Sequence, residues 1–136
     1  MEKLRLTIIF LMMSIPWSAF AACTGTPLDA ATLTTLIDGK TVCGRSGTDT
    51  WQEEHRVGGD LYDYKKGPND PIDPEEKVGT WNISSGMGHG AGAVTFTYSG
   101  GDSFSYLVYD NGGGAYSFCG AGGVIVDATV KSSPPC

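Results

Sequence analysis

The chain has 136 residues, enough for one compact domain with its own hydrophobic core but too few for two. Its 9 basic and 15 acidic side chains give a net charge of −6. This acidity argues against binding to nucleic acid or to an anionic membrane surface, because both need a basic patch.

Residues 1–21 have the pattern of a secretory signal peptide. Two basic residues precede an apolar run from Leu6 to Ile15, which is too short to span a bilayer, and Ala19-Phe20-Ala21 is a small-x-small cleavage site. We therefore expect one domain over residues 22–136, with 7 basic and 14 acidic side chains, that is secreted or periplasmic. No second apolar run approaches spanning length, so we expect no transmembrane segment in the mature chain.

The chain has four cysteines, which are Cys23, Cys43, Cys119 and Cys136. An even set in an exported chain predicts two disulfide bonds. Two pairings are open: Cys23–Cys43 with Cys119–Cys136, or Cys43–Cys119 with Cys23–Cys136. Phe20-Ala21-Ala22-Cys23 also resembles a bacterial lipobox, so a lipid anchor through Cys23 is the alternative localisation. Lipidation would leave another cysteine unpaired, which favours free secretion.

The sequence pattern of residues 26–37 predicts a short helix. Thr26 is the expected N-cap, Pro27 suits the first helical position, and Asp29 lies in the first turn. The apolar residues fall on one stripe, formed by Leu33, Leu36 and Ile37. A helix this short is stable only when it packs on other elements, so we expect it to lie on a sheet.

The remaining chain alternates apolar and polar residues over short stretches separated by glycine turns, a pattern typical of antiparallel strands. We expect eight strands, over residues 40–43, 50–57, 60–64, 78–83, 93–98, 103–109, 115–119 and 124–130. Lys65 to Lys77 is a polar loop with three prolines, and Ser84 to Gly92 is a glycine loop. The pattern predicts an all-β fold, an antiparallel up-and-down barrel of about eight strands with one N-terminal helix; a β-sandwich is the alternative.

Gly79-Thr80-Trp81 resembles the Gly-x-Trp signature of lipocalin- and avidin-like barrels, in which it normally lies on the first strand. The segment from Leu36 to Val42 is similar to the opening of small exported proteobacterial β-proteins of unknown function. These resemblances imply a small, exported, lipocalin-like barrel, and they carry over no catalytic or binding residue. We also expect Trp81 to be a core residue, because Gly79 would let its strand approach a neighbour closely.

The densest polar cluster is Trp51-Gln52-Glu53-Glu54-His55-Arg56. On a strand, Trp51, Glu53 and His55 share one face. Glu53 and His55 could donate two metal ligands or form a proton-transfer pair, and His89 from the glycine loop could add a third ligand. The favoured alternative is a solvated strand face with Glu54 and Arg56 outward, because no HxH or HExxH spacing is present. If the barrel binds a ligand, the candidate residues are Trp51, Glu53 and His55, together with Tyr62 and Tyr64 of the next predicted strand.

The acidic stretch, the serines and the cysteines give no catalytic or metal-binding motif. Asn69 to Glu76 gathers four carboxylates, but it lacks the EF-hand spacing of a calcium loop, and we interpret it as an exposed acidic loop. The serines form no Gly-x-Ser-x-Gly elbow, and the cysteines are interpreted as structural.

These patterns favour a binding or interaction protein, with no cofactor and no enzymatic activity expected. Its partner would be an unidentified small ligand or an envelope protein. One alternative is a protein-facing inhibitor or envelope factor that uses the acidic loop. Another is a metal-dependent enzyme centred on Glu53 and His55. A cavity on the order of a few hundred cubic ångströms would favour the small ligand.

Overall fold

The computed structural model describes residues 23–64, 75–88 and 90–136. The predicted signal peptide and the predicted ligand His89 lie outside these residues. The described part contains a helix, α1 (Ala30–Ile37), and a 3₁₀ turn, η1 (Ala121–Gly123). Its strands are β1 (Lys40–Ser46), β2 (Asp49–His55), β3 (Asp60–Asp63), β4 (Glu76–Met87), β5 (Ala91–Tyr98), β6 (Ser103–Gly112), β7 (Ala115–Gly120) and β8 (Ile125–Lys131).

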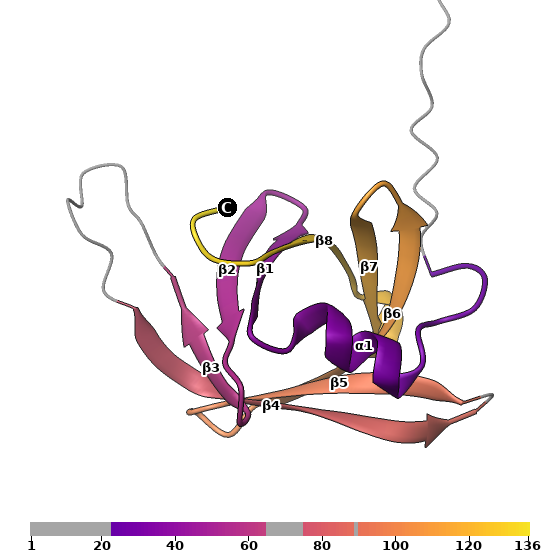
Figure 1. Ribbon diagram of the computed structural model, residues 1–136, viewed down its shortest axis with the longest axis horizontal. Helices are drawn as coiled ribbons and strands as arrows, with labels where there is room; N and C mark the ends of the chain where they lie inside the picture. Colours follow the sequence, from indigo (N-terminus) through magenta and orange to yellow (C-terminus); the bar gives the residue numbers. More distant parts are fainter. Residues whose placement is uncertain (1–22, 65–74, 89) are drawn as a thin grey trace, which may run out of the picture.

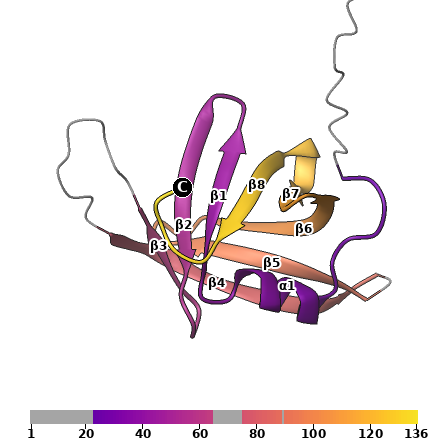
Figure 2. The ribbon, with the colours of Figure 1, turned by 45° about the horizontal axis from the view of Figure 1, so that its top comes forward.

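The eight strands form a closed barrel. Each strand pairs antiparallel with the next along the chain, and β8 pairs with β1 to close the ring (Figure 1). Figure 2 shows β8 beside β1 from a second direction. The predicted all-β, eight-stranded, up-and-down barrel with one short helix is confirmed.

β4 is longer than its hydrophobic pattern indicates. Glu76 and Lys77, predicted to lie in the polar loop, pair with β3, and Lys77 Nζ lies 2.7 Å from Asp60 Oδ1. At the other end β4 reaches Met87, and β5 begins at Ala91, so most of the predicted glycine loop is strand. The side chains at residues 76–77 and 84–86 are exposed, so no apolar alternation marks these stretches as strand. The backbone ladder holds them instead.

Alternate side chains of each strand point into the barrel, where the cross-strand register aligns them. Val42 on β1 lies opposite Glu53 on β2 and Val130 on β8. The buried apolar side chains form one core, which contains Leu33, Ile37, Val42, Leu61, Trp81, Val94, Phe96, Val108, Phe118, Val126 and Ala128. Trp81 is 8% exposed, and its Nε1 donates a 3.1 Å hydrogen bond to the carbonyl oxygen of Arg56, so its predicted core position is confirmed.

α1 begins at Ala30, later than the predicted Thr26. The N-cap is Asp29, whose Oδ1 accepts a 2.7 Å hydrogen bond from the N–H of Thr32. The prediction was wrong because Leu28 is held between two strands: its N–H donates to Val108 O, and its carbonyl accepts from the N–H of Gly92. The chain must therefore stay extended through Leu28.

The helix covers one end of the barrel. Leu33 and Ile37 are fully buried, and α1 packs mainly against β5, β4 and β1 (Figure 1). A Cβ atom at Gly92 would lie 2.6 Å from Ala30 Cα, so only glycine allows the helix to approach β5 this closely. Because β1 lies across the barrel from β4 and β5, the helix spans the end of the barrel and leaves its β7–β8 side less covered.

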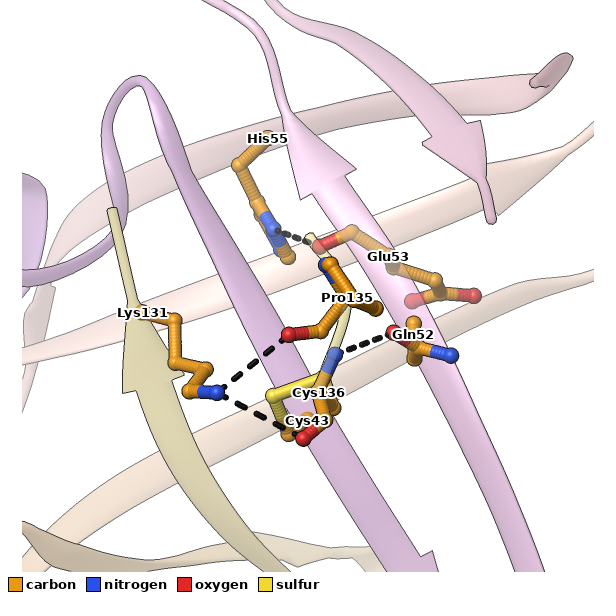
Figure 3. The surroundings of a disulfide bond; sticks show 7 residues. All are labelled: Cys43, Gln52, Glu53, His55, Lys131, Pro135 and Cys136. Atoms are coloured by element: carbon orange, nitrogen blue, oxygen red, sulfur yellow. Dashed lines mark hydrogen bonds between the residues drawn. A yellow bond between two sulfur atoms is a disulfide. The ribbon is translucent and has the colours of Figure 1, made fainter. Parts of the chain in front are cut away.

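Two disulfides form, Cys23–Cys119 and Cys43–Cys136, and neither expected pairing is correct. Cys43 on β1 and Cys119 on β7 are separated by β8, hence by roughly 9–10 Å. A disulfide spans at most about 7 Å between Cα atoms, which excludes their pairing. Each bond instead ties a terminal segment to the wall of the barrel, as Figure 3 shows for Cys43–Cys136. Among the described residues, no helix is long and apolar enough to cross a membrane.

Candidate functional site

Trp51, Glu53 and His55 share the face of β2 that points into the barrel. Glu53 is 8% exposed and His55 is 1% exposed, while Trp51 is half-buried. The favoured expectation placed Glu54 and Arg56 outward on a solvated face. Arg56 is exposed, whereas the face that carries Glu53 and His55 is buried. The shared face was predicted from the period of the strand, but which face is wet depends on how the barrel closes.

Glu53 is a buried carboxyl group with a tyrosine partner. The hydroxyl of Tyr98 donates a 2.9 Å hydrogen bond to Glu53 Oε1, and Asp63 lies opposite Glu53 on β3. Burial raises the pKa of Glu53 to about 7; the Tyr98 hydrogen bond opposes that shift, and the charge of Asp63 adds to it. Burial also raises the pKa of Tyr98 and of Tyr106, with Glu53 contributing to both.

His55 is a neutral core histidine. Its ring makes edge contacts with Trp81 and Phe96, at centroid distances of 5.4 and 5.3 Å. Nδ1 lies 3.2 Å from the carbonyl oxygen of Glu53, and only a protonated Nδ1 can donate to that oxygen. Nε2 is then an unprotonated acceptor, and it is buried without a partner among the described residues. Burial lowers the pKa of His55 to about 4.

The five predicted ligand-binding residues do not come together. Tyr62 alternates with the inward-facing Leu61, and the guanidinium of Arg56 lies 3.5 Å from the centre of the Tyr62 ring. Tyr64 follows β3 and is half-buried, with its N–H donating to Gln52 O. Trp51 covers Gly44 of β1, where any Cβ would collide with the indole. The polar core group is therefore Glu53, His55 and Tyr98, without Tyr62 and Tyr64.

The candidate metal ligands are also not assembled among the described residues. Within residues 23–64, 75–88 and 90–136, no group of three or more His, Cys, Asp or Glu side chains could hold a metal. His89, the predicted third ligand, lies outside that part of the chain. Most of the acidic loop, residues 69–74, also lies outside it, and Glu75 lies 2.6 Å from Arg56 as an ion-pair partner.

A groove of about 530 Å³ lies on the side of α1 that faces β7 and β8. Helix residues Thr32, Thr35 and Leu36 form one wall of the groove. The opposite wall includes Tyr116 of β7 and Val130 of β8, which belong to the inward face of the barrel and are half-buried. The groove therefore exists because the helix packs against β4, β5 and β1 and leaves this side of the barrel end open.

The groove is lined by two lysines, and no acidic side chain of the described part of the chain contributes to it. Lys40, the first residue of β1, is half-buried and takes part in no ion pair within the described residues. Lys131 at the end of β8 is directed elsewhere: its Nζ donates to the carbonyl oxygens of Pro135 and Cys136, at 3.2 and 3.4 Å (Figure 3). Of the described residues that line the groove, Lys40 is thus the one cation without a partner.

No match was found. No protein-family model, curated protein or solved structure matches this chain. A functional assignment must therefore start from the chemistry of its own residues.

Sequence reasoning missed the groove. Lys40 and Tyr116 are far apart in the chain, and they share a surface only because β8 closes the barrel between β1 and β7. One signal was available: in an up-and-down barrel the first and last strands are neighbours, so the residues at the start of the first strand and the end of the last one meet. Lys40 and Lys131 occupy those positions.

Proposed function

We propose that the protein is a small exported binding protein that holds a small organic ligand in the groove between α1 and β7–β8. The observation that carries this proposal is the groove itself, about 530 Å³ in volume. Ligand pockets typically have volumes of about 300–1,000 Å³ and combine an apolar surface with a few polar groups. Leu36 and Val130 supply the apolar surface, and Tyr116, Thr32 and Lys40 supply polar groups.

Export is the second part of the proposal. All four cysteines are paired, and such pairs persist in oxidising compartments, which the periplasm and the extracellular space both are. In addition, the bond to Cys119 occupies the sulfur that a lipid anchor on Cys23 would need. This favours a freely secreted or periplasmic protein over a lipid-anchored one.

The alternative of a metal-dependent enzyme has less support. His55 is 1% exposed and lies among Trp81 and Phe96, so a substrate would have no direct access to it. The protein-facing alternative would use the acidic loop, of which residues 69–74 lie outside the described part of the chain. Blocking the groove would leave binding at either of those places intact.

A matched pair of helix variants tests the groove. Thr35 lines it and Thr34 does not, yet both are exposed and both hydroxyls bond back to the carbonyl oxygen four residues earlier. We expect Thr35→Trp to abolish binding of the amphipathic dye 1-anilinonaphthalene-8-sulfonate and Thr34→Trp to preserve it, with equal melting temperatures. Equal dye binding by both variants, or no saturable binding by the wild type, would refute the groove as the ligand site.

A further inference from the structure

The groove has hydrogen-bond donors that no acceptor of the described residues uses, and these donors indicate which ligand it can bind. Lys40 brings an ammonium group, and Thr32, Tyr116 and Ser132 bring hydroxyls. None of these groups donates a side-chain hydrogen bond to another described residue, whereas the Thr35 hydroxyl is used within α1. A ligand that offers acceptors can therefore be bound by groups that are free.

The sign of the charge is also specified. The predicted mature chain carries a net charge of −7, but the groove is lined by lysines and by no carboxylate. Asp38 is two residues before Lys40 but does not line the groove. An ammonium group that has no counter-ion among the described residues can pair with an anion from solution.

Lys40, and not Lys131, is the group placed to bind that anion. The ammonium of Lys131 already donates to two carbonyl oxygens of the C-terminal segment, and the Cys43–Cys136 bond holds this segment against β1. Lys40 has no such partner within residues 23–64, 75–88 and 90–136. It also lies opposite His55 in the β1–β2 pair and is half-buried.

The walls of the groove specify the rest of the ligand. Leu36 of α1, Val130 of β8 and Tyr116 of β7 supply apolar surface to the same groove that Lys40 lines. A fully hydrated inorganic anion would gain nothing from these side chains. A molecule with an apolar body and one anionic head would use both parts of the groove.

We infer that the groove binds an amphipathic organic monoanion, whose anionic head pairs with Lys40 and whose apolar body packs against Leu36, Val130 and Tyr116. This inference rests on the groove being the ligand site proposed above. One free cation selects a single negative charge, because a second charge would have only hydroxyls to meet it.

Three probes of equal chain length separate head-group charge from apolar burial: octanoate, octan-1-ol and octylamine. In calorimetric titrations at pH 7, we expect octanoate to bind about tenfold more tightly than octan-1-ol, the range of a charge-assisted hydrogen bond. Octylamine should bind most weakly, because its cation would face Lys40. Raising the salt concentration should weaken octanoate binding and leave octan-1-ol binding nearly unchanged.

Three lysine variants locate the charge. Lys40→Met keeps most of the apolar stem, and we expect it to lower octanoate affinity to the octan-1-ol level without changing octan-1-ol affinity. Lys131→Met should change octanoate affinity less, because its ammonium is committed to carbonyl oxygens. Lys77→Met removes the same formal charge from β4, outside the groove, and should leave both affinities unchanged.

The outcomes distinguish the inference from the proposal beneath it. If none of the three probes binds, both the groove and its ligand class are wrong. If octan-1-ol binds as tightly as octanoate and Thr35→Trp abolishes both, the groove stands but the anionic ligand class is overturned. If Lys131→Met or Lys77→Met causes the loss and Lys40→Met does not, the assignment to Lys40 is overturned.

Discussion

Glu53 and Lys40 belong to adjacent strands of one barrel wall, yet the two charges have opposite surroundings. Glu53 points into the packed interior, is 8% exposed, and has a tyrosine hydroxyl as partner. Lys40 lies at the end of the same wall, half-buried in a groove, and has no ion-pair partner among the described residues. The difference is one of solvent access and not of residue type.

The comparison teaches how to separate a structural charge from a binding charge in this fold. A dry carboxyl group affects mainly stability and its pH dependence, because its ionisation must compete with desolvation. A half-buried, unpaired ammonium affects stability little and can bind an anion. We therefore expect substitutions in the interior to change stability most and substitution of Lys40 to change it least.

The largest effect should come from the interior beside His55. Trp81→Ala removes a ring that is 8% exposed and contacts His55, and we expect a loss of about 3–5 kcal/mol in the free energy of unfolding. Denaturant titration measures it. Trp51→Ala, at a half-buried position, is the matched control and should cost less. A loss below about 1 kcal/mol for Trp81→Ala would show that the interior is not packed around it.

The disulfide next to the groove should have a comparable but smaller effect. Replacing Cys43 and Cys136 together by serine opens a loop of 93 residues, and we expect a loss of about 2–4 kcal/mol. The same change releases the segment that holds Lys131. Octanoate affinity, measured at a temperature at which the variant is folded, should therefore not fall. A fall would show that the segment itself contributes to the groove.

The Glu53 carboxyl should control how stability depends on pH. Its pKa is raised from 4.5 to about 7, so the folded state holds the proton more tightly, and stability falls as pH rises from about 4.5 to 7. His55 has the opposite effect. Its pKa is lowered from 6.5 to about 4, so stability rises as pH rises from about 4 to 6.5. In the wild type the two slopes largely cancel between pH 4.5 and 6.5.

Glu53→Gln removes one of these slopes and keeps an oxygen for the Tyr98 hydroxyl. At pH 8 we expect the variant to be more stable than the wild type by up to about 3 kcal/mol, and at pH 4 to be nearly equal to it. Melting curves from pH 4 to pH 8 measure the difference. Glu54→Gln, on the adjacent residue outside the barrel, is the control. If the wild type and Glu53→Gln have parallel pH profiles, Glu53 is not the buried titrating group.

The smallest effect on stability should come from Lys40. Lys40→Met should change the free energy of unfolding by no more than about 0.5 kcal/mol, because the ammonium has no partner to lose. The same variant should lose octanoate affinity. A stability loss above about 1.5 kcal/mol would place Lys40 with Glu53, as part of the fold.

Much of the fold could be predicted from local pattern. Alternation and glycine turns indicate the strands from residue 93 to residue 130, and the apolar period of α1 places Leu33 and Ile37 in the core. The start of α1 could not be predicted in this way, because Leu28 is held by Val108 and Gly92, which are distant in the sequence. The disulfide pairing could not be predicted from local pattern either, because β8 lies between Cys43 and Cys119 in the barrel.

The sequence by itself determined which residues of β2 share a face, because a strand has a period of two wherever it lies. Only the tertiary structure decided that this face is dry, since closure between β8 and β1 turned it inward. Closure also brought Lys40 beside Val130 and Tyr116 and left them uncovered by α1. A local pattern specifies the direction of a side chain relative to its own strand. Solvent access, and with it the role of each charge, depends on what packs against that strand from elsewhere in the chain.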